Sequence, residues 1–150
     1  MNPLPIKVLA LDLEGTLISN AVSIFPRPGL FTFLDFCAQT FERVVLFTAV
    51  SEHRARQVVK LLADEGTAPT WFGDIEIVPY EGGYKDLNLV TNALPQEVLL
   101  VDDQECYVHP TQTDQWVPIQ QFFRPYPNDD RALEELKAIL GQRVAEKYIS

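Results

Sequence analysis

The sequence has few of the features that mark secreted or membrane proteins. Its 150 residues include only two cysteines, Cys37 and Cys106, which lie far apart and form no Cys-x-x-Cys pair. We therefore expect two thiols in a reducing, cytoplasmic setting. The apolar runs are well below the roughly 18 residues that a membrane span needs. The opening residues, MNPLPIKV, lack a charged segment followed by an apolar one, so we expect no signal peptide.

Positive charge is also scarce. Lys and Arg number 12 against 21 Asp and Glu, which gives a net charge of −9. A nucleic-acid-binding surface needs clustered basic residues, so nucleic acid is not an expected partner. The hydrophobic share of 47% is ordinary for a globular protein. Because no repeat, low-complexity tract or linker divides the chain, we expect a single domain over residues 1–150.

Short apolar runs alternate with helical patterns along the chain. From composition and turn signals, strands are expected over residues 8–11, 43–48, 75–78, 98–101 and 116–119. Helices are expected over residues 30–41, from Ser51 as N-cap to Gly66, weakly over 85–94, and over the tail with Asn128 as N-cap and Asp129 and Asp130 in the first turn. This alternation predicts an α/β fold with a doubly wound parallel sheet.

Acidic residues follow two of the apolar strands directly. The first strand is followed by Asp12 and Glu14, and the fourth by Asp102 and Asp103. Open α/β sheets bind their ligands at the carboxyl ends of the strands. Repulsion between carboxylates gathered at that edge is most simply offset by a bound cation. The sequence therefore predicts a metal-dependent site at this edge of the sheet.

Two further residues complete an ordered set: Thr48 at the second strand end and Lys85 after a glycine turn. In this order the residues resemble the four motifs of the haloacid dehalogenase (HAD) superfamily of phosphotransferases. Within it, four segments resemble the branch of polymerase C-terminal-domain and NLI-interacting-factor-like phosphatases: RPGL at 27–30, VVLFTA at 44–49, KDL at 85–87 and VLLVDD at 98–103. The resemblance implies a three-layer α/β/α fold and a phosphoric monoester hydrolase.

The resemblance also implies a role for each site residue. Asp12 would attack phosphorus and form an aspartyl-phosphate, and Glu14 would protonate the leaving oxygen and then activate water. Contacts to the phosphorylated substrate would come from Thr48, Ala49 and Lys85. Apart from the resemblance, the charge of Arg27 makes it a further candidate for such a contact. Mg²⁺ would neutralise the approach of nucleophile and phosphate. Its ligands would come from Asp12, the backbone carbonyl of Glu14, and the pair Asp102 and Asp103, with Asp103 preferred and Asp102 orienting Lys85.

Two departures from the branch bear on the substrate. Most of its members have Asp where this chain has Glu14, whereas an Asp-x-Glu pattern is known from the enolase-phosphatase branch. The segment between Asp12 and Thr48 is too short for an inserted cap domain, so we expect an open, capless site. An open site suits a phosphate displayed on a macromolecule, because a small metabolite is usually enclosed away from water.

Three functions are compatible with this pattern. The first is a protein phosphatase acting on phospho-Ser, phospho-Thr or phospho-Tyr, and the second is a small-metabolite phosphatase. The third is a binding module that kept the fold without catalysis. Outside the motifs, Cys37 is expected in the core. Arg54, Arg56 and Lys60 are expected to form a solvated helix face, with substrate contact by one of them as an alternative.

Overall fold

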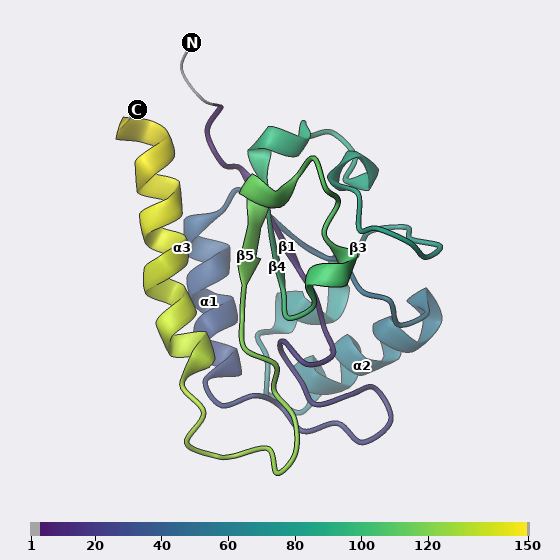
Figure 1. Cartoon of the computed structure of the whole chain (residues 1–150). Helices are drawn as coiled ribbons and strands as arrows, with labels where there is room; N and C mark the ends of the chain where they lie inside the picture. Colours follow the sequence, from purple (N-terminus) through teal and green to yellow (C-terminus); the bar gives the residue numbers. More distant parts are fainter. Residues whose placement is uncertain (1–3, 150) are drawn as a thin grey trace.

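Five parallel strands form one sheet in the computed structural model, which describes residues 4–149 (Figure 1). The strands are β1 (Val8–Leu11), β2 (Arg43–Leu46), β3 (Glu76–Ile77), β4 (Val98–Asp102) and β5 (Trp116–Pro118). Their order is β3-β2-β1-β4-β5, and every neighbouring pair is parallel. The chain thus winds outward from β1 in one direction and later in the other, which confirms the doubly wound α/β fold.

Alternation of side chains along the strands builds two hydrophobic layers. In β1, Leu9 and Leu11 belong to the larger layer and Val8 and Ala10 to the smaller one. The larger layer is formed with the helices α1 (Leu30–Thr40), α2 (Glu52–Asp64) and α3 (Ala132–Ile149). All four β1 residues are buried, as expected of a central parallel strand. Cys37 is fully buried on α1, as predicted, while Cys106 is exposed.

The smaller layer is covered by irregular chain rather than by the weak helix expected over 85–94. Only a 3₁₀ turn forms there, at Leu87–Leu89. The carboxylate of Asp86 accepts hydrogen bonds from the Asn88 N–H and the Gln112 side chain. The Gln112 amide oxygen in turn accepts from the Leu87 N–H. These side chains satisfy the backbone in a non-helical conformation and so compete with helix formation.

The tail helix also begins later than expected, at Ala132 rather than just after Asn128. Asp130 lies before the helix, where its Oδ1 accepts the Ala132 N–H at 3.1 Å. The same carboxylate is hydrogen-bonded to Arg27, a partner 103 residues away that no local pattern reveals. At the other predicted cap, Ser51 accepts the Arg54 N–H and begins α2 as expected.

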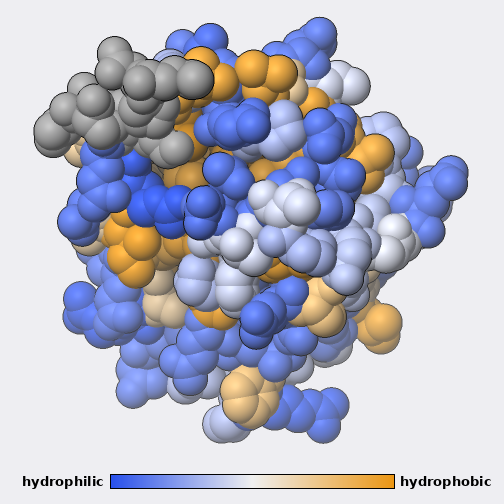
Figure 2. All heavy atoms as spheres, turned by 45° about the horizontal axis from the view of Figure 1, so that its top comes forward, coloured by the Kyte–Doolittle hydropathy of each residue, from blue (hydrophilic) through white to orange (hydrophobic). Residues whose placement is uncertain are grey.

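The carboxyl ends of the strands lie at the bottom of Figure 1, where loops join them to the helices. Within residues 4–149, the segment between β1 and α1 forms two isolated bridges and no inserted helix, so the fold is capless as predicted. Figure 2 brings the opposite end forward and shows mainly hydrophilic residues with scattered apolar ones. Among the described helices, none is both long enough and apolar enough to cross a membrane.

Candidate active site

Lys85 links the two acidic strand ends. Its ammonium Nζ lies 2.9 Å from Asp12 Oδ1 and 2.6 Å from Asp102 Oδ2. The side chains of Lys85 and Asp102 are completely buried. The lysine backbone is fixed as well, because its N–H donates to the Tyr107 carbonyl at 2.7 Å, and the Tyr107 ring centre lies 4.5 Å from Nζ. The fold therefore brings Lys85 together with two acids that lie 73 and 17 positions from it in the sequence.

Burial and charge act in opposite directions on these groups. Burial raises the pKa of Asp12 well above its usual range, against the Lys85 charge, and the Asp102 charge raises it further. Burial likewise raises the pKa of Asp102, opposed by Lys85. Burial alone would lower the pKa of Lys85, but the two carboxylates raise it, so this lysine is a cation at neutral pH. One buried cation thus serves two carboxylates.

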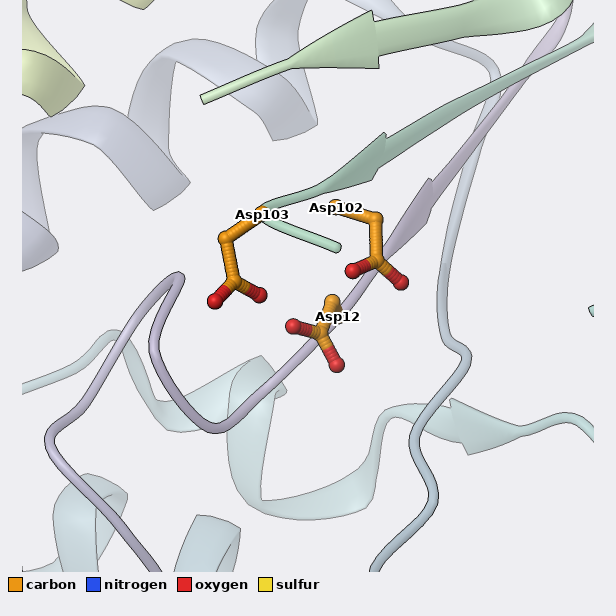
Figure 3. A group of neighbouring side chains, drawn as sticks. All are labelled: Asp12, Asp102 and Asp103. Carbon is orange, nitrogen blue, oxygen red and sulfur yellow. The ribbon is translucent and has the colours of Figure 1, made fainter. Parts of the chain in front are cut away.

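Asp103 completes an acidic cluster with Asp12 and Asp102 (Figure 3). One carboxylate oxygen from each of the three lies within 4.8 Å of the others. The Thr16 hydroxyl lies between two of them, 2.9 Å from Asp12 Oδ2 and 3.3 Å from Asp103 Oδ1. Gly15 permits this approach, because a Cβ at its φ of +75° would stand 2.5 Å from Asp103 Oδ2.

A polar cavity of about 330 Å³ opens over this cluster. It is lined by Asp12, Glu14, Gly15, Ser19, Asn20, Thr48, Ala49, Asp103, Gln104, Tyr107 and Gln121. Glu14 is half-buried, with its Oε2 accepting the Ala21 N–H at 2.7 Å. Thr48 Oγ1 accepts the Val50 N–H at 3.1 Å, which leaves the hydroxyl able to donate into the cavity. Lys85 and Asp102 lie beneath the cavity wall rather than in it.

The family model of NLI interacting factor-like phosphatases matches residues 7–148. The chain belongs to this family. A solved structure of a variant of the fission yeast RNA polymerase II CTD phosphatase Fcp1, bound to beryllium fluoride, has a similar fold, with a TM-score of 0.57 at 16% identity. The match covers 95% of this chain and 52% of that one, so the chain spans about half the length of that protein. A search of curated proteins found no match.

Membership of the NLI interacting factor-like phosphatase family confirms the resemblance that the four sequence segments carried. The structural likeness confirms the HAD-like α/β fold. Of the residues expected in the site, Asp12, Glu14, Thr48, Ala49 and Asp103 line the cavity. Their roles stay predictions.

The structure corrects the substrate contact expected of Arg27. Its side chain is fully buried and pairs with Asp130, Nε to Oδ1 at 2.9 Å and Nη2 to Oδ2 at 3.1 Å. The remaining donors reach the backbone carbonyls of Gly15, Thr16 and Gln120. With every donor group engaged in the protein, Arg27 fixes the loop after β1 to the segment before α3 and leaves nothing for a substrate.

This pairing predicts a large loss of stability for Asp130→Asn. Removing one partner of a buried ion pair leaves an uncompensated charge, so we expect the free energy of unfolding in urea to fall by about 3 kcal/mol at pH 7. The exposed neighbour gives a matched control, and Asp129→Asn should change stability by less than about 0.5 kcal/mol. Equal effects of the two substitutions would contradict the pairing.

The same variant should show a defined pH dependence. Burial by itself would raise the pKa of Asp130, but the hydrogen bonds and charge of Arg27 and the Ala132 N–H hold it below the usual value. A lowered pKa in the folded state contributes stability above the unfolded pKa of about 3.9, and this contribution is lost as pH falls through the folded pKa. The difference in free energy of unfolding between the native protein and Asp130→Asn should therefore become smaller as the pH falls below about 3.9.

Several residues in or next to the cavity were not predicted from the sequence. Thr16 follows Asp12 by four positions, and this spacing after a strand-end acid could have marked it. Asn20, Gln104 and Gln121 come from three separate loops, and no local pattern distinguishes them from ordinary surface residues. Tyr107 escapes for a similar reason, since its contact with Lys85 depends on two loops packing together.

Two arginines of α2 that were expected to face solvent bind backbone carbonyls instead. Arg56 donates to the carbonyls of Gly73 and Ile75, at 3.1 and 2.7 Å. Arg54 donates through Nε to the Ala21 carbonyl at 2.9 Å, and Nη2 binds the same oxygen. Only Lys60 is strongly exposed as expected, with a side-chain exposure of 69%.

Proposed function

We propose that the chain is a Mg²⁺-dependent phosphatase that hydrolyses phosphate monoesters of proteins through an aspartyl-phosphate on Asp12. The observation that carries this proposal is the placement of Asp12. Its carboxylate lies at the floor of an open cavity, with one oxygen on the Lys85 ammonium and the other on the Thr16 hydroxyl. A carboxylate held at both oxygens has a fixed orientation, which favours attack on a substrate bound in the cavity.

The chemistry proceeds in two displacements. An Asp12 oxygen forms a bond to phosphorus while the bond to the leaving oxygen breaks, and that oxygen takes a proton from Glu14. Glu14, now a carboxylate, then removes a proton from water as the water oxygen attacks phosphorus, and the bond to Asp12 breaks to release phosphate. Thr48 donates a hydrogen bond to a phosphoryl oxygen, and Lys85 stabilises negative charge from below.

The acidic cluster fits a divalent cation. With all three acids ionised, the three carboxylates and one ammonium carry a net charge of −2 in a largely buried site, which a divalent ion would balance. Carboxylate oxygens are the ligands that Mg²⁺ prefers. When bound, the ion neutralises the phosphoryl group as the nucleophile approaches.

Asp103 is the better candidate than Asp102 for binding this ion. Asp102 is completely buried and does not line the cavity, and its oxygens bind the Lys85 ammonium at 2.6 Å and the Gln104 N–H at 2.9 Å. Asp103 instead lines the cavity beside Asp12. We therefore propose Asp12, Asp103 and the Glu14 carbonyl as the protein ligands, with Asp102 orienting Lys85.

The open site supports a protein substrate. No cap covers the cavity in residues 4–149, and the similar solved structure is that of a phosphatase named for a polymerase domain. The test is a panel of phospho-Ser, phospho-Thr and phospho-Tyr peptides beside sugar and nucleotide phosphates, assayed with Mg²⁺. We expect turnover of peptides to exceed that of metabolites. Activity confined to metabolites would favour the small-molecule alternative, and no activity on any substrate would favour a binding module.

Removing the metal should abolish this activity. A chelator is expected to reduce turnover to background, with recovery when excess Mg²⁺ is added. Because even residues that support a metal ligand contribute 10- to 100-fold to affinity, Asp103→Asn should raise the Mg²⁺ concentration for half-maximal activity by about 100-fold or more. Glu105→Gln, which removes an exposed charge nearby, is the control and should leave this concentration unchanged. Chelator-resistant turnover would rule out the proposed mechanism.

A further inference from the structure

We propose that Arg54 is a positioning residue for Glu14, acting through the peptide groups of Ala21; this inference rests on the proposed function. Arg54 belongs to α2 and does not line the cavity, so it has no direct access to a bound phosphate. Its guanidinium holds the Ala21 carbonyl with Nε at 2.9 Å and with Nη2. The Ala21 N–H in turn donates to Glu14 Oε2 at 2.7 Å.

The segment that carries Ala21 needs this support. Between β1 and α1 the described chain has only isolated bridges, so regular secondary structure does not fix the position of Ala21. The side chains of its neighbours Ser19 and Asn20 make hydrogen bonds within this segment, to the backbone of Ser23, Phe25 and Val22. The two Arg54 donors tie the loop to α2, which is a rigid element packed on the sheet. Ala21 itself is buried, so the segment meets little water at this point.

Hydrogen bonds at the carbonyl and the N–H of Ala21 thus connect Arg54 on α2 to Glu14, the proposed acid/base. A longer side chain than Asp at this position has an extra rotatable bond, and a fixed donor removes that freedom at one carboxylate oxygen. The second oxygen, Oε1, is left to exchange a proton with the leaving group or water. A shift of about 1 Å in a catalytic group can reduce the rate by about 100-fold, so loosening Ala21 should disturb proton transfer.

Proton donation to the leaving group gives this role a specific signature. An alkoxide leaving group, as from phosphoserine, needs a proton to depart, whereas p-nitrophenolate departs readily without one. The first displacement determines kcat/KM, so a badly placed acid should lower kcat/KM for the phosphoserine peptide far more than for p-nitrophenyl phosphate. A general loss of folding or of phosphate binding would lower both values alike.

The experiment compares Arg54→Gln, Arg54→Lys and Arg56→Gln on both substrates. For Arg54→Gln we expect kcat/KM to fall about 30- to 100-fold for the peptide and less than about 3-fold for p-nitrophenyl phosphate. Arg54→Lys, which keeps one charged donor in place of the fork, should recover part of the loss. Arg56→Gln is the control, because it removes an arginine of the same helix that also binds two backbone carbonyls. For this variant, the ratio of kcat/KM for the peptide to kcat/KM for p-nitrophenyl phosphate should equal that of the native protein.

A double variant separates this inference from the proposed function. In one outcome, Glu14→Gln lowers kcat/KM selectively for the phosphoserine peptide, with Arg54→Gln adding little further loss in the Glu14→Gln background. In that case Arg54 acts through Glu14, as proposed. If Glu14→Gln is selective but Arg54→Gln affects both substrates equally or neither, the positioning role is wrong and the acid/base assignment stands. If Glu14→Gln itself shows no selectivity, the assignment of Glu14 fails and the inference fails with it.

Discussion

Asp12→Asn is expected to lower kcat/KM by at least about 10⁴-fold while the protein stays folded. Removal of a covalent nucleophile is among the most damaging substitutions in an enzyme, and an amide cannot form the proposed acyl-phosphate. The fold should tolerate the change, because Lys85 keeps its shorter contact to Asp102 and the side chain keeps its size. Urea unfolding should give nearly the same slope and a midpoint close to that of the native protein.

Trapping provides a second measurement on the same pair of proteins. The native protein, mixed rapidly with a phosphorylated substrate and quenched in acid, should carry a phosphoryl group that hydroxylamine removes, as expected of an acyl-phosphate. Asp12→Asn should carry none. Retention of more than about 1% of native turnover, or of the labelled intermediate, would place the nucleophile elsewhere and overturn the proposed mechanism.

The sequence predicted the layout of the sheet well because the information is local. Each central strand is a short apolar run, and β1 was placed at residues 8–11, where the structure has it. The acids that follow β1 and β4 converge because parallel strands end at one edge. Lys85 is different, since an isolated lysine carries no sign of burial. Only the order of motifs singled it out.

What the sequence could not show depends on contacts between distant segments. Arg27 was expected to touch substrate, and its partner Asp130 lies too far along the chain for any periodic pattern to connect them. The weak helix over 85–94 failed for a similar reason, since the Gln112 side chain satisfies the backbone at Leu87. Arg54 was assigned to a solvated face because helical periodicity describes which way a side chain points and not what it reaches.

Lys85→Met is the second substitution expected to have a large effect, because it should damage both stability and activity. Methionine fills similar space but leaves two buried acids, Asp12 and Asp102, without their shared counter-charge. We expect the free energy of unfolding to fall by about 3 to 5 kcal/mol at pH 8. Loss of the positive charge that lies beneath the cavity and holds Asp12 should separately lower kcat by about 10²- to 10³-fold.

The two effects can be separated by pH and by a second substitution. Burial already raises the pKa of Asp102, and a carboxyl with a raised folded pKa loses stability as pH rises above its unfolded value of about 3.9. The loss in free energy of unfolding caused by Lys85→Met should therefore be smaller at pH 5 than at pH 8, because protonation of Asp102 is more extensive at the lower pH. Adding Asp102→Asn removes the more deeply buried of the two unpaired charges and should restore part of the stability at pH 8 while turnover stays low. Recovery of turnover together with stability would mean that Lys85 serves only the fold, and that the charge opposite the phosphate comes from another group.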